Sequence, residues 1–199
     1  MVKSSAAYAL SLLLLAGLSA PAHAGARTSV KTTYYSISGT TGMDLFRDMN
    51  RKGPRHAFMK KAMAQTQYRT MPRGKMIWKN GMCSVQDGGY SLDLTYVYPK
   101  PASRLSGRLA ANWKAFMADT YRHEKVHGRL AMEMANKLDS TLRRFRMKDS
   151  RTCGHALSRL SGQINAIYAE YKKRQVAFDV AEHRKGGKVE KSVLLLVKE

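Results

Sequence analysis

The sequence predicts an α+β fold in which a small antiparallel sheet packs against one long helix, with a second helix near the C-terminus. All five prolines of the 199-residue chain lie at or before Pro101, so the residue that interrupts helices most strongly is absent from the rest of the chain. That half contains segments rich in β-branched and aromatic residues, whereas apolar residues recur at three- and four-residue steps in the second half. A block of strands followed by a block of helices is typical of α+β domains.

The first half is predicted to begin with a strand and a short helix. Residues 29–39 are β-branched and aromatic, as expected of a strand. Apolar residues three apart at Met43, Phe46 and Met49 predict a short helix, which should end at Gly53-Pro54.

A hairpin and a further strand are predicted next. Residues 67–85 favour a hairpin, with turns expected near residues 72–74 and at Asn80-Gly81. Residues 90–101 alternate between apolar and polar and predict a strand that its closing prolines should end. We expect the Tyr90–Tyr98 portion to lie at an edge of the sheet, where an extended peptide can add as another strand.

The second half is predicted to form two helices. The first carries a long apolar stripe with three- and four-residue steps: Leu109, Trp113, Phe116, Ala131, Met134, Leu138, Leu142 and Phe145. The second carries Leu157, Leu160, Ile164, Ile167, Tyr171 and Phe178. Cys153-Gly154 separates the two helices, and a Gly186-Gly187 break precedes a short apolar run at the C-terminus.

Residues 1–24 are predicted to be a secretory signal peptide. Lys3 supplies positive charge, residues 9–18 form an apolar run, and Ala22-His23-Ala24 provides a small-x-small cleavage site. The apolar run is shorter than the roughly 20 residues that span a bilayer. We therefore expect cleavage after Ala24, one domain over residues 25–199 without a transmembrane segment, and a secreted or periplasmic protein.

Export determines how the two cysteines are interpreted. Cys83 and Cys153 are the only cysteines, and an even pair in an oxidising compartment favours a disulfide. Such a bond closes a loop of about 70 residues and contributes roughly 4 kcal/mol on the chain-entropy model. Two free structural thiols are the alternative.

Three polar residues interrupt the apolar stripe of the long helix near its middle. At 100° per residue, His127 falls close to the centre of the stripe, and His123 and Glu124 lie on either side of it. Burial of these groups without partners would cost several kcal/mol, and a metal ion removes that cost by making ligands of the imidazoles. The alternative is two surface histidines beside a Glu–Lys helix pair.

The spacing H-E-x-x-H is the one that a zinc site on a helix requires. His123 and His127 lie one turn apart on one face, so both can bind one Zn²⁺ ion. Glu124 lies about 100° around the helix from His123, so it is not expected to be a ligand of the same ion. We expect it to act as the general base that activates a water molecule on the zinc for attack on a peptide carbonyl. Gly128, next to the second histidine, suggests a close approach by a strand or a substrate backbone, with a tolerated glycine equally favoured.

A catalytic zinc usually has three protein ligands, so one more is expected. The candidates are His56, Glu133, His155, Glu170, Asp179, Glu182 and His183. The metzincin pattern is excluded, because Leu130 and Glu133 stand where it requires Gly and His. Two antiparallel helices joined by a short turn would bring the end of the second helix back to the middle of the first, which favours His183, with Asp179 next. An exposed helix-end histidine is the alternative for His183.

The net charge of +21, from 35 Lys and Arg against 14 Asp and Glu, favours anionic partners. The basic residues are scattered in short runs, with no nucleic-acid motif, so a solvated basic surface is favoured over a specific patch. We expect a peptide or protein substrate, an anionic cell-envelope surface as a further candidate partner, and no specific nucleic acid.

The chain resembles a bacterial family of predicted secreted zinc-dependent proteases, formally a domain of unknown function (922), from about Tyr34 to Gly187. The resemblance rests on YYSISGTTGMDLFRDM, LDLTYVYPK, WKAFMADTYRHEKVHGRLA and FDVAEHRKGG. It implies a minimal zincin-like fold, His123 and His127 as zinc ligands and Glu124 as the catalytic residue. FDVAEH is similar to the family's C-terminal Asp/His stretch, which supports His183 as the third ligand.

The expected activity is therefore zinc-dependent hydrolysis of peptide bonds. Two alternatives keep the same histidines: an envelope-associated zinc-binding protein without catalysis, and a zinc amidase or peptidase that acts on cell-wall peptides, whose anionic polymer would suit the positive charge.

Overall fold

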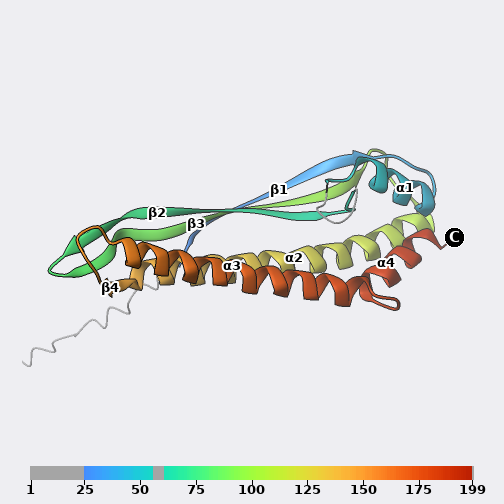
Figure 1. Cartoon of the computed structure of the whole chain (residues 1–199). Coiled ribbons are helices and arrows are strands. Elements are labelled where there is room, and N and C mark those ends of the chain that lie inside the picture. Colours follow the sequence, from blue (N-terminus) through green and yellow to red (C-terminus); the bar gives the residue numbers. More distant parts are fainter. Residues whose placement is uncertain (1–24, 56–60, 199) are drawn as a thin grey trace, which may run out of the picture.

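A long sheet covers one side of two long antiparallel helices, and two short helices lie together at one end of them (Figure 1). The computed structural model describes residues 25–55 and 61–198, so the expected signal peptide and His56 lie outside the described residues. The α+β class predicted from the sequence is confirmed. Within the described ranges, no helix has the length and apolar character needed to cross a bilayer.

The sheet has four strands and is mixed. Its strands are β1 (Arg27–Ile37), β2 (Gln65–Lys79), β3 (Met82–Pro101) and β4 (Arg146–Lys148), in the order β1-β3-β2, with β4 also paired to β3. β2 runs antiparallel to β3, as expected, and so does β4, a strand that the sequence did not predict, but β1 runs parallel to β3. The cause is topological: the chain reverses twice between β1 and β3, and β3 inserts between β1 and β2.

This order corrects the expected edge position of Tyr90–Tyr98. Residues 91–97 pair with β1 on one side and with β2 on the other, so they form the centre of the sheet, and Tyr90 and Tyr98 each have a partner on one side. β3 also continues through Pro99 to Pro101 instead of ending before them. The last residue of β3 that pairs with β2 is Val97, so after Val97 β3 pairs with β1 only. Prolines are tolerated there, because one side of the strand is unpaired.

The hairpin has one of its two expected turns. Asn80 and Gly81 connect β2 to β3 with φ values of 48° and 76°, as a two-residue type I′ turn requires. The turn expected at residues 72–74 is wrong: the strand continues there through a bulge, with a register shift between Arg73 and Lys75. Gly74, at φ 110°, provides the left-handed conformation that the bulge needs.

The helices are α1 (Gly42–Lys52), α2 (Gly107–Arg144), α3 (Gly154–His183) and α4 (Lys188–Val197). A capping box begins α1, with Asp44 bonded to the Thr41 backbone and Thr41 to the Asp44 backbone. α2 lies beneath β3, whose alternate residues Leu92 and Leu94 pack on Ala131 and Ala135 of α2. The long helix is therefore buried along the face that the sequence predicts.

A disulfide fixes the start of α3 to the sheet. Cys83 of β3 is bonded to Cys153, which directly precedes α3, as predicted. The bonded residues are 70 positions apart, and closing such a loop contributes about 4 kcal/mol on the chain-entropy model. Because Cys153 lies between α2 and α3, the bond also fixes where α3 begins beside the end of α2.

Gly128 of α2 lies against the sheet. A Cβ atom at this position would lie 1.9 Å from the hydroxyl oxygen of Tyr96 and 2.8 Å from its ring, so only glycine lets the β3 tyrosine reach the helix. The close approach by a strand that the sequence suggests is confirmed.

Gly128→Ala should lower the free energy of unfolding by about 1–3 kcal/mol, because displacing the Tyr96 ring outweighs the helix propensity gained. Gly162→Ala is the matched control. Gly162 lies inside α3 with no atom within 4 Å of the added Cβ, so alanine should stabilise by about 0.5–1 kcal/mol. Urea denaturation measures both, and a stabilised Gly128→Ala protein would contradict the packing of Tyr96.

Candidate metal centre

The middle of α2 faces the last turns of α3. Ion pairs define the register of the two helices: Lys137 with Glu170 at 2.8 Å, Glu133 with Arg174 at 2.7 Å, and Arg122 with Glu182. The two helices run antiparallel, so each step back along α2 corresponds to a step forward along α3. The H-E-x-x-H segment of α2 therefore lies opposite residues 175–183.

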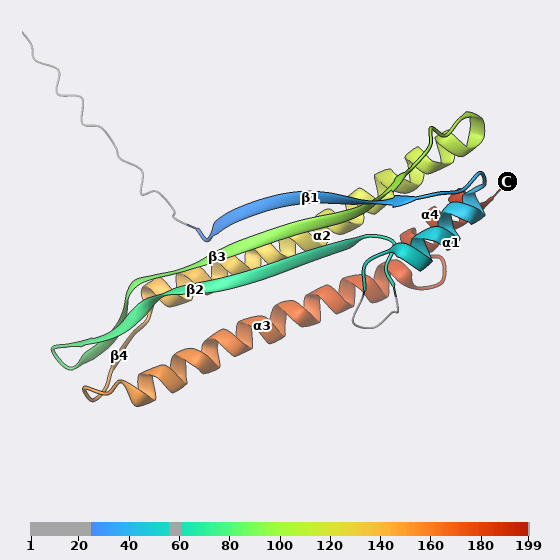
Figure 2. The same ribbon diagram turned by 90° about the horizontal axis from the view of Figure 1, so that it is seen from above.

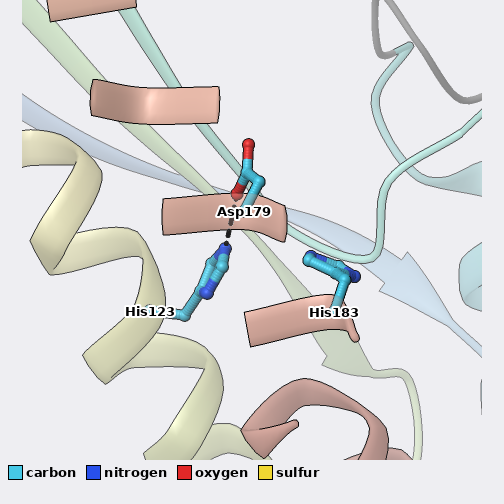
Figure 3. A group of neighbouring side chains, drawn as sticks. All are labelled: His123, Asp179 and His183. Carbon is cyan, nitrogen blue, oxygen red and sulfur yellow. Dashed lines mark ion pairs between the residues drawn. The ribbon is translucent and has the colours of Figure 1, made fainter. Parts of the chain in front are cut away.

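Three side-chain atoms converge between the helices. The Nε2 atoms of His123 and His127 lie 3.1 Å apart. Asp179 Oδ1 lies 2.9 Å from His127 Nε2 and 3.4 Å from His123 Nε2. Figure 3 shows Asp179 reaching from α3 toward His123 on α2. The structure thus brings together both predicted histidines and the carboxylate that the sequence places second among the further ligands.

His183 adjoins this group. It lies one turn beyond Asp179 on α3, and its ring centre is 5.6 Å from that of His123 (Figure 3). Ligand atoms of His123, Asp179 and His183 all lie within 4.8 Å of one another. His123 is buried, Asp179 is partly exposed and His183 is exposed, so the group opens to solvent at the C-terminal end of α3.

Gln175 fixes which nitrogen of His127 faces the group. The amide nitrogen of Gln175 donates to the carbonyl oxygen of His127 at 3.2 Å, so its amide oxygen is turned toward His127 Nδ1, with which it forms a hydrogen bond. Nδ1 is consequently the donor, and Nε2 of the neutral ring presents a lone pair toward Asp179. A lone pair facing a carboxylate oxygen at 2.9 Å requires a cation between them, either a proton or a metal ion.

Among the described residues, His123 is held by packing and not by a hydrogen bond to its outer nitrogen. Its Nδ1 atom is buried and has no hydrogen-bond partner in the described part of the chain. The nearest carboxylate oxygen is Oε2 of Glu182, at 3.7 Å, and Arg122 binds the same carboxylate. The ring of Phe178 packs against both imidazoles, with ring centres 4.9 Å from His123 and 5.2 Å from His127. Packing and these neighbours restrict both rings to orientations in which the Nε2 atoms face each other.

The electrostatics follow from these contacts. Burial raises the pKa of Asp179, but its bonds to His123 and His127 outweigh this and hold the pKa well below its usual range. Burial lowers the pKa of His127, and the bonds to Asp179 and Gln175 more than offset this, so the pKa is raised. Burial, together with the charge of His123, lowers the pKa of His183. Without a metal, a proton on His127 is therefore the cation that Asp179 favours.

Glu124 lies on the sheet side of α2. Its carboxylate is buried, and its Oε2 atom accepts a hydrogen bond of 2.6 Å from the hydroxyl of Thr66 on β2. The same hydroxyl lies 3.0 Å from the Glu124 carbonyl oxygen. Seen from above, β2 runs between the ribbons of α2 and α3 (Figure 2). β2 thus fixes the carboxylate of Glu124, the predicted general base, on the side of α2 that faces the sheet.

The remaining candidates from the sequence lie elsewhere. Glu133 and Glu170 form exposed ion pairs with Arg174 and Lys137. His155 lies at the start of α3, at the opposite end of that helix from Asp179.

Sequence reasoning missed Gln175, Phe178 as a ring support, and Thr66. A signal for Gln175 exists: the apolar stripe of the second helix runs from Tyr171 to Phe178, and the position between them at helical spacing is the polar Gln175. Polar residues in a buried stripe are the same feature that identified His123 and His127. Thr66 carries no such signal, because its role depends on the way β2 crosses α2.

Comparison with known proteins identifies a family. The model of the family described as a bacterial protein of unknown function (DUF922) matches residues 32–187. Neither the search of curated proteins nor that of solved structures found a match. The family match covers most of the chain, and the chain belongs to this family.

In metal-free protein, Asp179→Asn should lower the pKa of His127, because the carboxylate that favours the charged ring is removed while burial still disfavours it. The pKa of His127 is raised in the folded wild-type protein, so the pairing of His127 with Asp179 contributes to the free energy of unfolding. This contribution is complete below the pKa of the unfolded histidine, and it is lost as the pH rises through the pKa of His127 in the folded protein. NMR titration of the imidazole protons measures the shift.

Glu170→Gln is the control for this titration, since it removes an exposed carboxylate from the same helix and should leave His127 unchanged. An unchanged His127 pKa in Asp179→Asn would show that the carboxylate does not face the ring.

Proposed function

We propose that this member of the DUF922 family is an exported zinc-dependent metallopeptidase that hydrolyses peptide bonds. The observation that supports the proposal is the convergence of three atoms of metal-binding types, the Nε2 atoms of His123 and His127 and Oδ1 of Asp179, beside a buried glutamate. The lone pair of His127 and the carboxylate of Asp179 face each other and need a cation between them, and the residue types are those that bind Zn²⁺.

The spacing of the three atoms fits zinc. Tetrahedral bonds of about 2.0–2.1 Å place ligand atoms about 3.3 Å apart, and the distances here run from 2.9 to 3.4 Å. Gln175 supplies the hydrogen bond to the outer nitrogen that usually orients a metal-binding histidine. We therefore assign His123, His127 and Asp179 as the ligands, with His183, the third ligand favoured from the sequence, as the adjoining candidate.

When bound, zinc would lower the pKa of a water molecule toward 7 and polarise a carbonyl oxygen. The chain's own residues supply the proton transfer. The Thr66 hydroxyl occupies Oε2 of Glu124, which leaves Oε1 to take a proton from the attacking water and pass it to the leaving amine. Burial of Glu124 keeps this exchange out of bulk solvent.

An extended substrate has a strand edge available beside the centre. β2 pairs with β3 along one side only among the described residues, and Thr66 of β2 contacts Glu124. We propose that substrate adds to the free edge of β2 near Thr66, in place of the Tyr90–Tyr98 segment expected from the sequence. The exposure of Asp179 and His183 gives access from solvent.

A zinc-binding protein without catalysis is the second candidate, and the position of His183 favours it. Ligand atoms of His123, Asp179 and His183 lie within 4.8 Å of one another, and a shift of His183 toward His127 would bring a fourth protein ligand to the same ion. Four protein ligands close a zinc site and leave no position for water or substrate.

Glu124→Gln should retain zinc and lose peptide hydrolysis by a factor of roughly a hundred or more, as expected when a general base is removed. Glu133→Gln is the matched control, because Glu133 lies on the same helix in an exposed ion pair, and it should leave zinc content and activity unchanged. Assays with casein and with purified cell-wall peptides separate a protein substrate from an envelope substrate. Cleavage by Glu124→Gln at the wild-type rate would contradict the assignment.

The ligand assignment predicts unequal effects of the two α3 residues. Asp179→Ala should weaken zinc binding by more than a hundredfold, since loss of a supporting hydrogen bond alone costs 10–100-fold. His183→Ala should cost about tenfold or less. A hydroxamate should bind the zinc-loaded wild type at its open position. If both variants lost equal zinc affinity and the hydroxamate failed to bind, the result would favour a zinc site closed by four protein ligands.

A further inference from the structure

A surface cavity of about 600 Å³, broadly open to solvent, lies at the far end of the helix pair from the metal centre. Residues from the end of α2, from β4 and from the first half of α3 line it. Ile167 belongs to its lining, and three turns of α3, about 18 Å along the axis, separate that residue from Asp179. The cavity is therefore distinct from the centre described above.

Three arginines line this cavity: Arg144, Arg146 and Arg159. None of its lining residues is acidic. Across the described ranges 25–55 and 61–198, none of the three arginines forms an ion pair. The nearby buried carboxylate of Asp139 is already bound to Arg143 at 2.6 Å. Positive charge thus accumulates in a concave site without a neutralising group, on a chain whose net charge is +21.

One of the three arginines is held in place. Nη1 of Arg146 donates to the carbonyl oxygens of Phe145, at 2.7 Å, and Arg143, at 3.3 Å, at the C-terminal end of α2. Its remaining N–H groups are free to bind a ligand. A guanidinium fixed on the backbone loses less conformational entropy on binding than a freely rotating side chain does.

The lining indicates the chemical class of the ligand. Guanidinium groups match the oxygens of a phosphate in two-pronged hydrogen bonds, and Thr141 and Gln163 add a hydroxyl and an amide. The partly exposed Met147, with the small exposed parts of the buried Phe145 and Ile167, provides an apolar wall. The volume falls within the roughly 300–1,000 Å³ of small-molecule sites. We propose that this cavity binds a phosphate ester, with its phosphate on the three arginines and its organic part against the apolar wall.

The test compares two arginine triples by titration with glycerol 3-phosphate and with phosphatidylglycerol vesicles. R144Q/R146Q/R159Q removes the cavity arginines. R27Q/R69Q/R104Q removes three exposed arginines elsewhere and changes the net charge equally. The cavity triple should lose at least tenfold in affinity, and the control triple much less. Saturable binding of glycerol 3-phosphate identifies a soluble ester, and binding to vesicles alone identifies a lipid headgroup.

Two outcomes would overturn the proposal. Equal losses in both triples would mean that net charge alone attracts the phosphate, and no saturable binding of either probe at millimolar phosphate would mean that no site exists. Wild-type protein provides a measurement that does not depend on how the variants fold. The side-chain Nε–H resonances of Arg144 and Arg159 should shift on titration with the phosphate ester, and unchanged resonances at saturation would contradict the assignment.

Discussion

The site depends on one electrostatic constraint: the lone pair of His127 and the carboxylate of Asp179 face each other beside His123, and a cation must lie between them. Gln175 turns the lone pair of His127 toward Asp179, and the Nε2 atom of His123 faces the same point. A proton on His127 satisfies the pair with Asp179, which explains the raised pKa of that histidine. A zinc ion bound as proposed would bind all three atoms at once. Its binding would then release the proton of His127, so metal binding would depend on pH.

The fold creates this constraint by fixing how α2 and α3 lie against each other. The short connection between the helices and the Cys83–Cys153 bond place the start of α3 beside the end of α2. Antiparallel packing then brings residue 179 opposite residues 123 and 127. The sheet contributes from the other side, because β2 places Thr66 on Glu124 and β3 places Tyr96 on Gly128. The helix pair and the sheet together orient His123, Glu124, His127 and Asp179, the four residues of the proposed centre.

Features with a local cause could be predicted from the sequence. Periodicity located both long helices, Asn80-Gly81 marked the hairpin turn, and polar residues in a buried stripe marked His123 and His127. Features that depend on contacts distant in sequence could not be predicted. The central position of β3, the bulge near Gly74 and the bond from Thr66 to Glu124 all follow from how strands pair and cross α2. The contact of Asp179 with both histidines likewise needs the register of two helices, which periodicity along one helix does not supply.

The most direct test of this account is anomalous scattering at the zinc edge from crystals of the zinc-loaded protein. The account predicts one strong zinc peak between α2 and α3, within about 2.0–2.2 Å of His123 Nε2, His127 Nε2 and an Asp179 carboxylate oxygen. A well-ordered crystal without zinc between these helices, or with both imidazoles turned toward solvent, would contradict it.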